Sequence, residues 1–245
     1  MPRRFRHGFT LIELLVVISI IALLIGILLP SLGQARQWAM TGKCLSQIRN
    51  MQVAHWMYMT ENDGAFIDVG LPHAGIHSDE DVAWVNTLEE YYGSQLIHRS
   101  PVDDSPYWDQ TIPGSGGRYR RTSYGVNDYL SSSLPFTPKY LELESVPRPA
   151  ATVQFLIMTF GHESAEQAYA GSDHVHVYLW GDAFNPDNSP LKASRHAEIN
   201  AHGGPERSWQ SVSNWGFLDG HAETLEFGEV YRAPVDNNFN PVYAY

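Results

Sequence analysis

The sequence predicts an α+β fold, in which a long N-terminal helix packs on an antiparallel β-sheet and the C-terminal region is rich in loops. Three observations predict this class. The chain opens with an apolar run, a second stretch has helical periodicity, and the remaining residues alternate β-branched and aromatic segments with turns. A helical part followed by a run of strands is typical of α+β proteins.

The apolar run at residues 9–29 is the first expected element. About 20 residues of helix suffice to cross the roughly 30 Å hydrocarbon core of a bilayer. Arg3, Arg4 and Arg6 precede the run, and such positive flanks stay in the cytoplasm, so we expect the bulk of the chain across the membrane. A removable secretory signal would show a small-residue cleavage site after the run. Residues 28–31 read Leu-Leu-Pro-Ser, which predicts that the segment stays attached.

Beyond this run, the chain is expected to stay helical to about residue 60, with a bend at Pro30. Apolar side chains gather within an arc of about 140° at 100° per residue; they are Cys44, Leu45, Ile48, Met51, Trp56 and Met59. Polar residues occupy much of the opposite side, namely Ser46, Gln47, Arg49 and Asn50. Such a stripe predicts packing against a sheet. The turn signal at residues 61–64 ends the helix.

The globular part begins after this turn. A capping signal at residues 78–81 predicts a short helix over residues 82–92, which Gly93 ends. Residues 100–149 are rich in Pro, Gly, Ser and Tyr, and they predict loops with one short strand.

Three further segments predict the sheet. Residues 152–158 are β-branched and aromatic and predict a buried strand, and residues 174–180 alternate as a second strand does. Residues 215–227 predict a hairpin that turns at Asp219-Gly220. These segments provide the surface on which the apolar stripe of the helix is expected to lie.

Charge and cysteine content limit the function. The formal net charge is −11, which argues against a nucleic-acid partner held through phosphate neutralisation. Without the first three arginines, the remaining 13 basic and 27 acidic residues give −14. Cys44 is the one cysteine, so no disulfide forms within the chain.

The segment Gly8-Phe9-Thr10-Leu11-Ile12-Glu13 resembles the processing signal of type IV prepilins and type II secretion pseudopilins. That signal has a short basic leader, a Gly before the scissile bond, a Phe after it and a Glu four residues later. The resemblance covers residues 6–30, including Pro30 at the position of a helix-kinking proline. It implies that prepilin peptidase cuts between Gly8 and Phe9 and N-methylates Phe9.

The resemblance also implies a domain organisation and a set of partners. Residues 1–8 would be the leader, residues 9–60 the transmembrane and amphipathic helix, and residues 61–245 an extracytoplasmic pilin-like domain. The expected location is the inner membrane, single-pass, with the N-terminus cytoplasmic before cleavage and the domain periplasmic or extracellular. Expected partners are prepilin peptidase, other pilin or pseudopilin subunits, the inner-membrane assembly platform and membrane lipid, without nucleic acid.

Glu13 is the unusual residue of the apolar run, because a carboxylate in hydrocarbon costs on the order of 3 kcal/mol. Under the resemblance, cleavage creates an ammonium group at Phe9, and in a filament the Glu13 carboxylate of one subunit meets the ammonium of a neighbour. The pair then penalises misaligned helices. The alternative is a plain single-pass anchor in which Glu13 snorkels to the interface or becomes protonated.

Further segments resemble a pilin-like group common in planctomycete-type bacteria: residues 44–49, 58–64, 123–127 and 214–221. The C-terminal signature of that group is a His, nine residues, then Asp-Gly. Here His196 precedes Asp219-Gly220 by a gap of 22 residues, which an insertion at residues 197–213 would explain. The segment Ser100-Pro101-Val102-Asp103 resembles the group's Cys-Pro-x-Asp. If Cys44 pairs with that Cys in the group, this chain has lost the bridge.

Two candidate metal sites remain open. His174 and His176 lie two apart on an expected strand and so share a face; with His196, His202, Asp219 and His221 they are candidates for zinc. No compact zinc motif is present, and scattered surface histidines are the alternative. For calcium, the candidates are Asp182, Asn185, Asp187 and Asn188, since the resemblance implies a calcium loop in major pseudopilins. The spacing differs from an EF-hand, and an Asx-rich turn is the alternative. No other cofactor is expected.

No catalytic motif stands out, since the chain lacks a G-x-S-x-G elbow and its Gly-rich segment 114–118 lacks the Lys-Ser/Thr of a phosphate loop. We therefore expect a non-enzymatic, membrane-anchored pilin-like or pseudopilin subunit of a type IV pilus or type II secretion filament. Two alternatives stay open: a membrane-tethered secretion-accessory or binding protein that does not polymerise, and a tethered metal-dependent enzyme.

Overall fold

The structure is a computed structural model that describes residues 10–73, 80–92, 98–132, 134–135, 137–182 and 184–245. It divides into two units, residues 1–40 and residues 41–245, which are taken separately below. The leader, Gly8 and Phe9 lie outside the described residues, as do residues 78, 79 and Gly93 of the predicted short helix.

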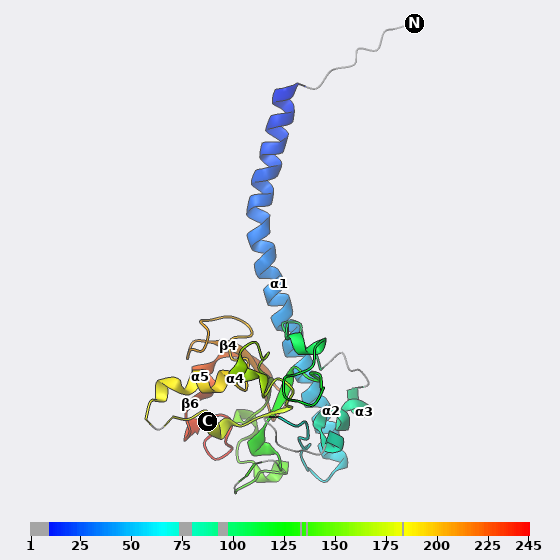
Figure 1. The fold of residues 1–245 in the computed structure, drawn as a ribbon, viewed down its shortest axis with the longest axis vertical. Helices are drawn as coiled ribbons and strands as arrows, with labels where there is room; N and C mark the ends of the chain where they lie inside the picture. The colour runs from blue at the N-terminus through cyan, green and yellow to red at the C-terminus, as the bar shows by residue number, and fades with distance from the viewer. Residues whose placement is uncertain (1–9, 74–79, 93–97, 133, 136, 183) are drawn as a thin grey trace. The chain divides into compact units, whose positions relative to one another are not determined.

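Helix α1, Leu11–Glu61, confirms the long N-terminal helix. Its 51 residues include Pro30, and Figure 1 shows the helix continuing through this position as a gently curved ribbon. Proline cannot donate the backbone hydrogen bond of an inner helical turn. Pro30 therefore removes one hydrogen bond from the helix, but α1 does not end there.

In the first unit, the apolar side chains of α1 are exposed. Every large hydrophobic residue from Leu11 to Leu32 is solvent-accessible, for example Leu11 at 79% and Leu32 at 67%. The segment is long and apolar enough to cross a membrane, and none of it is buried within the protein. An apolar surface of this length is unfavourable in water, so it is expected to lie in lipid or against partner helices.

In the second unit, the later turns of α1 bury one face, which includes Cys44, Ile48, Met51 and Met59. The predicted stripe is largely confirmed, but two positions differ. Trp56 is 37% exposed and donates its Nε1–H to the Leu218 carbonyl at 3.1 Å. Gln47, which we placed on the polar side, is buried, because its Oε1 accepts from the Tyr124 hydroxyl at 2.9 Å and its Nε2 donates to the Arg99 carbonyl.

The main sheet has five strands in the order β3-β1-β2-β4-β5. Their bounds are β1 Tyr124–Asn127, β2 Val153–Ile157, β3 His174–Val175, β4 Val212–Phe217 and β5 Ala222–Glu226. All pairings are antiparallel except β1 with β3. A second, two-stranded sheet contains β6 Tyr231–Ala233 and β7 Asp236–Asn237. The α+β architecture, the buried strand and the hairpin at Asp219-Gly220 are thus confirmed, and the sheet is mixed rather than purely antiparallel.

Short helices connect the strands, with α2 and α3 at one side of the globular unit and α4 and α5 at the other (Figure 1). The α-helices are α2 Trp84–Thr87, α3 Glu89–Tyr92, α4 Ser164–Gln167, α5 Ser189–Ser194 and α6 Phe227–Val230. The 3-10 helices are η1 Glu80–Val82, η3 Pro106–Trp108, η4 Asp128–Leu130, η5 Leu143–Ser145, η6 Pro149–Ala151, η7 Val177–Leu179 and η8 Pro186–Asn188.

Two predicted elements differ from the structure. The helix expected over residues 82–92 is broken into η1, α2 and α3, because Ala83 is extended (φ −58°, ψ 130°) and Trp84 is buried with its Nε1–H on the Asp173 carbonyl. The strand expected over residues 174–180 ends at Val175. His176 leaves β geometry (φ −91°, ψ 77°), and η7 turns Trp180 into the core.

Residues of the motifs resembling the pilin-like group hold the later turns of α1 against the sheet. The Tyr124 hydroxyl contacts Cys44 Sγ at 3.3 Å, and Asn214 donates its amide to the Thr41 carbonyl at 3.1 Å. A Cβ at Gly216 would meet the Ile48 side chain at 2.4 Å. The helix therefore approaches the sheet more closely than any larger residue at position 216 permits.

Asp103 of the Ser-Pro-x-Asp segment has a structural role. Its carboxylate accepts from Arg120 Nε at 2.8 Å and from the Ser123 hydroxyl at 2.6 Å, and the Asp103 and Arg120 side chains are fully buried. Arg120 also donates to the Thr159 and Ala170 carbonyls. A buried charge pair of this kind is stable only when such extra hydrogen bonds are present.

Ser100 lies next to Cys44, as expected if it replaces a bridging cysteine. The Ser100 hydroxyl is 3.8 Å from Cys44 Sγ, and both residues are buried. We predict that Ser100→Cys forms a disulfide, because the two side chains already meet. Closing a loop between positions 56 apart raises the free energy of unfolding by at most about 4 kcal/mol in the chain-entropy model.

Two measurements on the full chain in detergent test this outcome. Thiol titration after oxidation detects the disulfide, and thermal unfolding detects the gain in stability. Ser100→Ala is the matched control, since it removes the hydroxyl without adding a thiol. Two free thiols in the folded, oxidised Ser100→Cys protein would show that the side chains cannot bridge.

His55 on α1 predicts acid sensitivity of the core. It is fully buried between the Ile67 amide and the Gln154 side-chain amide, and burial lowers its pKa to about 3. In the unfolded chain, His55 becomes protonated near pH 6.5. The contribution of neutral, buried His55 to the free energy of unfolding is therefore complete above that pH and is lost as the pH falls from 6.5 towards 3. Between pH 7 and pH 5, His55 alone is expected to lower the free energy of unfolding by about 2 kcal/mol.

Chemical denaturation of the full chain in detergent at several pH values tests this expectation. His55→Gln keeps an acceptor but does not titrate. In this variant, the slope of the free energy of unfolding against pH should decrease by the equivalent of about one proton. His162→Gln changes an exposed histidine and serves as the control. An equal slope in wild type and His55→Gln would contradict the assignment.

Candidate functional site

At the start of α1, Thr10 and Glu13 form reciprocal hydrogen bonds. The Glu13 amide donates to Thr10 Oγ1 at 3.2 Å, and the Thr10 amide and hydroxyl donate to Glu13 Oε2 at 2.9 and 2.7 Å. This is a capping box, in which a Thr and a Glu three residues later satisfy each other's backbone amides. Our sequence analysis missed it, although the Thr-x-x-Glu pattern is its usual signature. Glu13 thus has partners within its own chain.

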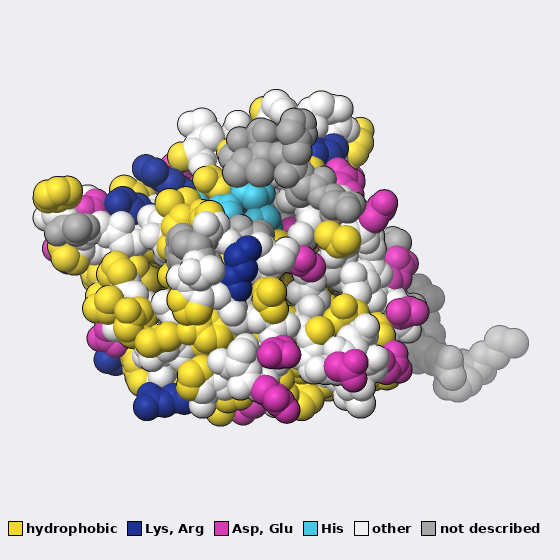
Figure 2. Space-filling model, turned by 90° about the horizontal axis from the view of Figure 1, so that it is seen from below, with side chains coloured by type: hydrophobic (Ala, Val, Ile, Leu, Met, Phe, Trp, Pro, Cys, Tyr) yellow, Lys and Arg dark blue, Asp and Glu magenta, His cyan; other side chains and the backbone are white. Residues whose placement is uncertain are grey.

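A histidine cluster occupies one edge of the main sheet. His73, His174 and His176 are buried, and each offers a ring nitrogen within 4.8 Å of the others. His73 Nε2 is 2.7 Å from His176 Nε2. His174 belongs to β3, His176 precedes η7, and His73 comes from the segment after α1. Figure 2 shows histidine side chains reaching the surface of one face of this unit.

Two buried carboxylates orient the imidazole rings of His174 and His176. His174 Nδ1 is 2.9 Å from Asp173 Oδ1, and His176 Nδ1 is 3.1 Å from Asp128 Oδ2. The parallel register explains the second contact, because Val126 and Asn127 of β1 pair with His174 and Val175 of β3. The next residues along the two strands, Asp128 and His176, therefore lie side by side.

The environment keeps at least one of the imidazoles neutral. Burial, followed by the nearby His174 and His176, lowers the pKa of His73 to about 3. Burial also raises the pKa of the Asp128 carboxyl, against the effect of His176. Neutral imidazole is the form that binds metal ions.

His196 lies beside the cluster but does not share its geometry. Its ring centroid is 6.0 Å from that of His176, and its Nδ1 accepts from Trp180 Nε1 at 3.0 Å. Burial lowers the pKa of His196 to about 3. The predicted candidate is therefore close to the site, with one ring nitrogen already engaged in the core.

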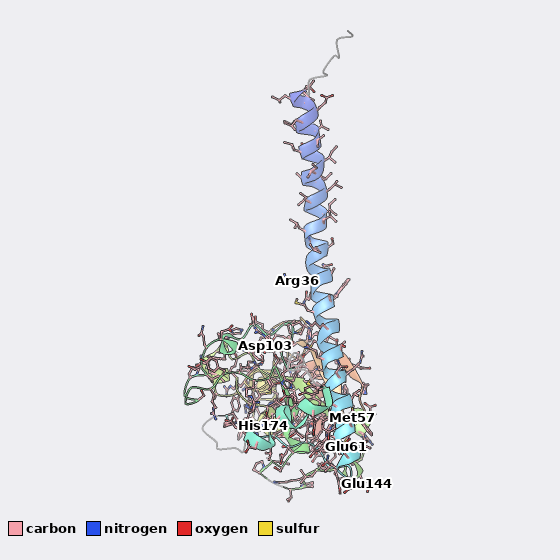
Figure 3. All side chains as sticks on the ribbon, turned by 90° about the vertical axis from the view of Figure 1, so that its right-hand side faces the viewer. Arg36, Met57, Glu61, Asp103, Glu144 and His174 are labelled. Atoms are coloured by element: carbon pink, nitrogen blue, oxygen red, sulfur yellow. The ribbon has the colours of Figure 1, made fainter. Side chains whose placement is uncertain are left out.

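The other zinc candidates lie elsewhere. Asp219 and His221 bond to each other at the turn between β4 and β5, whereas His174 lies on β3, the opposite edge strand of the sheet. His202 contacts the Thr41 hydroxyl at 3.1 Å. Figure 3 shows His174 within the globular unit, with Met57 and Glu61 on the last turns of α1. The structure therefore joins His174 and His176 with His73, a residue that the sequence analysis did not select.

The predicted calcium loop forms an Asx-type turn. Asp182 Oδ1 accepts from the Phe184 and Asn185 amides at 3.0 Å, and Asp182 Oδ2 lies 3.1 Å from Lys192 Nζ. Asn188 Nδ2 donates to the same carboxylate. These hydrogen bonds, the Asn185 amide first, lower the pKa of Asp182. Because a lysine and three N–H groups converge on Asp182, its geometry favours the turn over a calcium ligand.

A pocket of about 520 Å³ adjoins the cluster. His73 contributes to its wall together with Leu71, Ile112, Arg118, Tyr119 and Arg121. The lining is mainly apolar and carries both charges, because Glu80 also belongs to it and its Oε1 lies 3.6 Å from Arg118 Nη1. Such a pocket suits a small, largely apolar ligand.

Comparisons with known proteins bear on the N-terminal segment. The family model described as the prokaryotic N-terminal methylation motif matches residues 3–29. The comparison with curated proteins found no match, and neither did the comparison with solved structures. The matched range contains the predicted cleavage site, Glu13 and most of the exposed apolar part of α1. The chain carries a type IV prepilin-like N-terminal methylation signal.

Proposed function

We propose that this chain is a membrane-anchored pilin-like subunit that prepilin peptidase processes between Gly8 and Phe9 and that assembles through α1 into a type IV pilus or type II secretion filament. The methylation motif at residues 3–29 is the observation that carries the proposal. The globular domain forms the exposed part of the subunit and is not enzymatic. Other pilin-type subunits and an inner-membrane assembly platform are its partners.

The exposed face of α1 supports this proposal. The apolar side chains from Leu11 to Leu32 have no protein neighbours in the described structure, and they face outward all around the helix. Lipid covers such a surface in a single subunit, and neighbouring helices cover part of it in a filament. The three arginines before it keep the leader in the cytoplasm, and the domain lies on the periplasmic or extracellular side.

The hydrogen bonds of Glu13 are compatible with intersubunit pairing. Both Thr10 donors bind Oε2, and no described residue donates to Oε1. The ammonium group of a processed Phe9 from a neighbouring subunit pairs with this second oxygen. In a medium without water, an ammonium–carboxylate pair is favoured over the two separated charges, so it fixes the stagger of adjacent helices.

Processing is tested on the native protein. We expect mass spectrometry of the purified polypeptide to show a chain that begins at a monomethylated Phe9. Gly8→Leu should leave the leader in place, since a small residue before the scissile bond is part of the signal. Ser19→Ala, a change inside the apolar run, is the control for membrane insertion. An unmodified N-terminus with residues 1–8 attached in the wild type would refute the proposal.

Assembly is tested by separating the two roles of Glu13. Glu13→Gln retains a capping side chain but removes the charge, and we expect it to reduce the filament fraction at least about tenfold, in line with the loss of a partly buried ion pair. Thr10→Ala removes the cap but keeps the charge, and we expect it to reduce the filament fraction less than Glu13→Gln does. Shear fractionation and electron microscopy measure the filament.

Equal assembly by wild type and Glu13→Gln would contradict the pairing. A processed wild-type protein that remains monomeric in the membrane would instead support the tethered accessory or binding protein. The two tests therefore distinguish failure of processing from failure of polymerisation.

A further inference from the structure

We infer that His73, His174 and His176 form a binding site for one divalent transition-metal ion of the zinc class. The inference is independent of filament assembly, because the three residues belong to the globular unit. It rests on the convergence of three imidazoles, on their orientation by carboxylates and on the charge of the site.

The nitrogen atoms have the spacing that a metal ion requires. Zinc binds histidine nitrogen at about 2.0–2.1 Å, so two ligands of a tetrahedral ion lie about 3.3 Å apart. The candidate atoms lie between 2.7 Å, for the pair from His73 and His176, and 4.8 Å. Small side-chain rotations bring the shortest and the longest of these nitrogen–nitrogen distances to about 3.3 Å. The ion replaces the contact between His73 and His176. The proton that His73 Nε2 shares in this contact moves to His73 Nδ1, which has no hydrogen-bond partner, so that His73 and His176 both bind the ion as neutral imidazoles.

The second coordination sphere matches that of a metal site. Asp173 and Asp128 bind the Nδ1 atoms of His174 and His176, which leaves the Nε2 atom of each ring directed away from its carboxylate and available as a ligand. Carboxylate–histidine–metal arrangements fix the tautomer and the ring orientation in this way. The Gly70 amide further holds Asp173 through Oδ2 at 2.9 Å.

Charge gives an independent argument. The side chains of Asp128 and Asp173 have no accessible surface, and among the described residues their ion-pair partners are histidines only. Asp128 Oδ1 is buried without a hydrogen-bond partner. Two buried carboxylates without a lysine or arginine are costly unless a cation compensates them. One divalent ion between three neutral imidazoles neutralises both.

The site has three protein ligands and one open position. His196 is engaged with Trp180 and does not complete the set. Three protein ligands plus water are the arrangement of a zinc ion that remains accessible to a further ligand. The pocket lined by His73 gives a small molecule a place from which to reach the open position.

The test uses the full chain in nonionic detergent, freed of metal with a chelator and then equilibrated with Zn²⁺ alone. We expect one tightly bound zinc per chain, measured by elemental analysis and by isothermal titration. His174→Gln should lose it, and Asp128→Asn should weaken affinity about 10–100-fold. His221→Gln, which alters the exposed His–Asp pair at the hairpin, is the matched control and should bind as wild type does.

X-ray absorption of the zinc-loaded wild type keeps the test independent of the folding of any variant. It should show about three nitrogen ligands at roughly 2.0–2.1 Å, and Co²⁺ should give the visible absorption of a four-coordinate site. Absence of stoichiometric zinc in the wild type would overturn the inference. Zinc retained at equal affinity in a folded His174→Gln protein, or a shell of oxygen atoms only, would also overturn it.

Discussion

The contact between the later turns of α1 and the main sheet is the constraint on which the globular unit depends. Ile48 of α1 fits against Gly216 of β4 at a distance that excludes a Cβ. Gln47 and Thr41 then receive hydrogen bonds from Tyr124 and Asn214 on two different strands. Because the helix is joined to β1 and to β4, its packing fixes the centre of the sheet. The same helix is mostly apolar and exposed over residues 11–29, where Glu13 and Ser19 are its strongly polar side chains, so one continuous element meets two different environments.

The parallel pair β1–β3 lies at one edge of this sheet. Only two residues of β3 pair before the chain turns into η7. The turn places Trp180 in a buried apolar cluster beside Phe227 and Phe239. The parallel register brings the residues that follow β1 and β3 together, and these are Asp128 and His176. The histidine cluster thus arises at a short edge strand that pairs in parallel with its neighbour, whereas the other strand pairs of the sheet are antiparallel.

The sequence predicted the elements with strong local signals. The apolar run, the strand at residues 152–158 and the hairpin at Asp219-Gly220 each have a periodicity or a turn that local chemistry decides. The burial of Gln47 could not be predicted, because its partner Tyr124 lies 77 residues away. The same holds for His73, whose contact with His176 spans 103 positions. The His174 and His176 pair was visible as an i, i+2 pattern, whereas the third imidazole required the fold.

The prediction of a strand at residues 174–180 was wrong beyond Val175, for a related reason. Alternation along the segment predicts a strand, but β3 lies at the edge of the sheet, and the burial of Trp180 with its indole N–H on His196 favours a turn. Tertiary packing therefore overrode a local preference. The Thr10–Glu13 capping box is the opposite case, since its Thr-x-x-Glu signal is local and present in the sequence.

The capping box changes how the proposed intersubunit pairing is understood. A free glutamate would lose side-chain rotamer freedom when it meets the ammonium group of a neighbour, which costs about 1.5–2 kcal/mol. Glu13 is already held by two donors from Thr10 on one carboxylate oxygen, so much of that loss occurs when α1 forms rather than when subunits meet. The second oxygen is then presented in a fixed direction at the start of the helix. Preorganisation of this kind strengthens association without any additional contact, and it makes Thr10 a contributor to the proposed assembly through the position of Glu13.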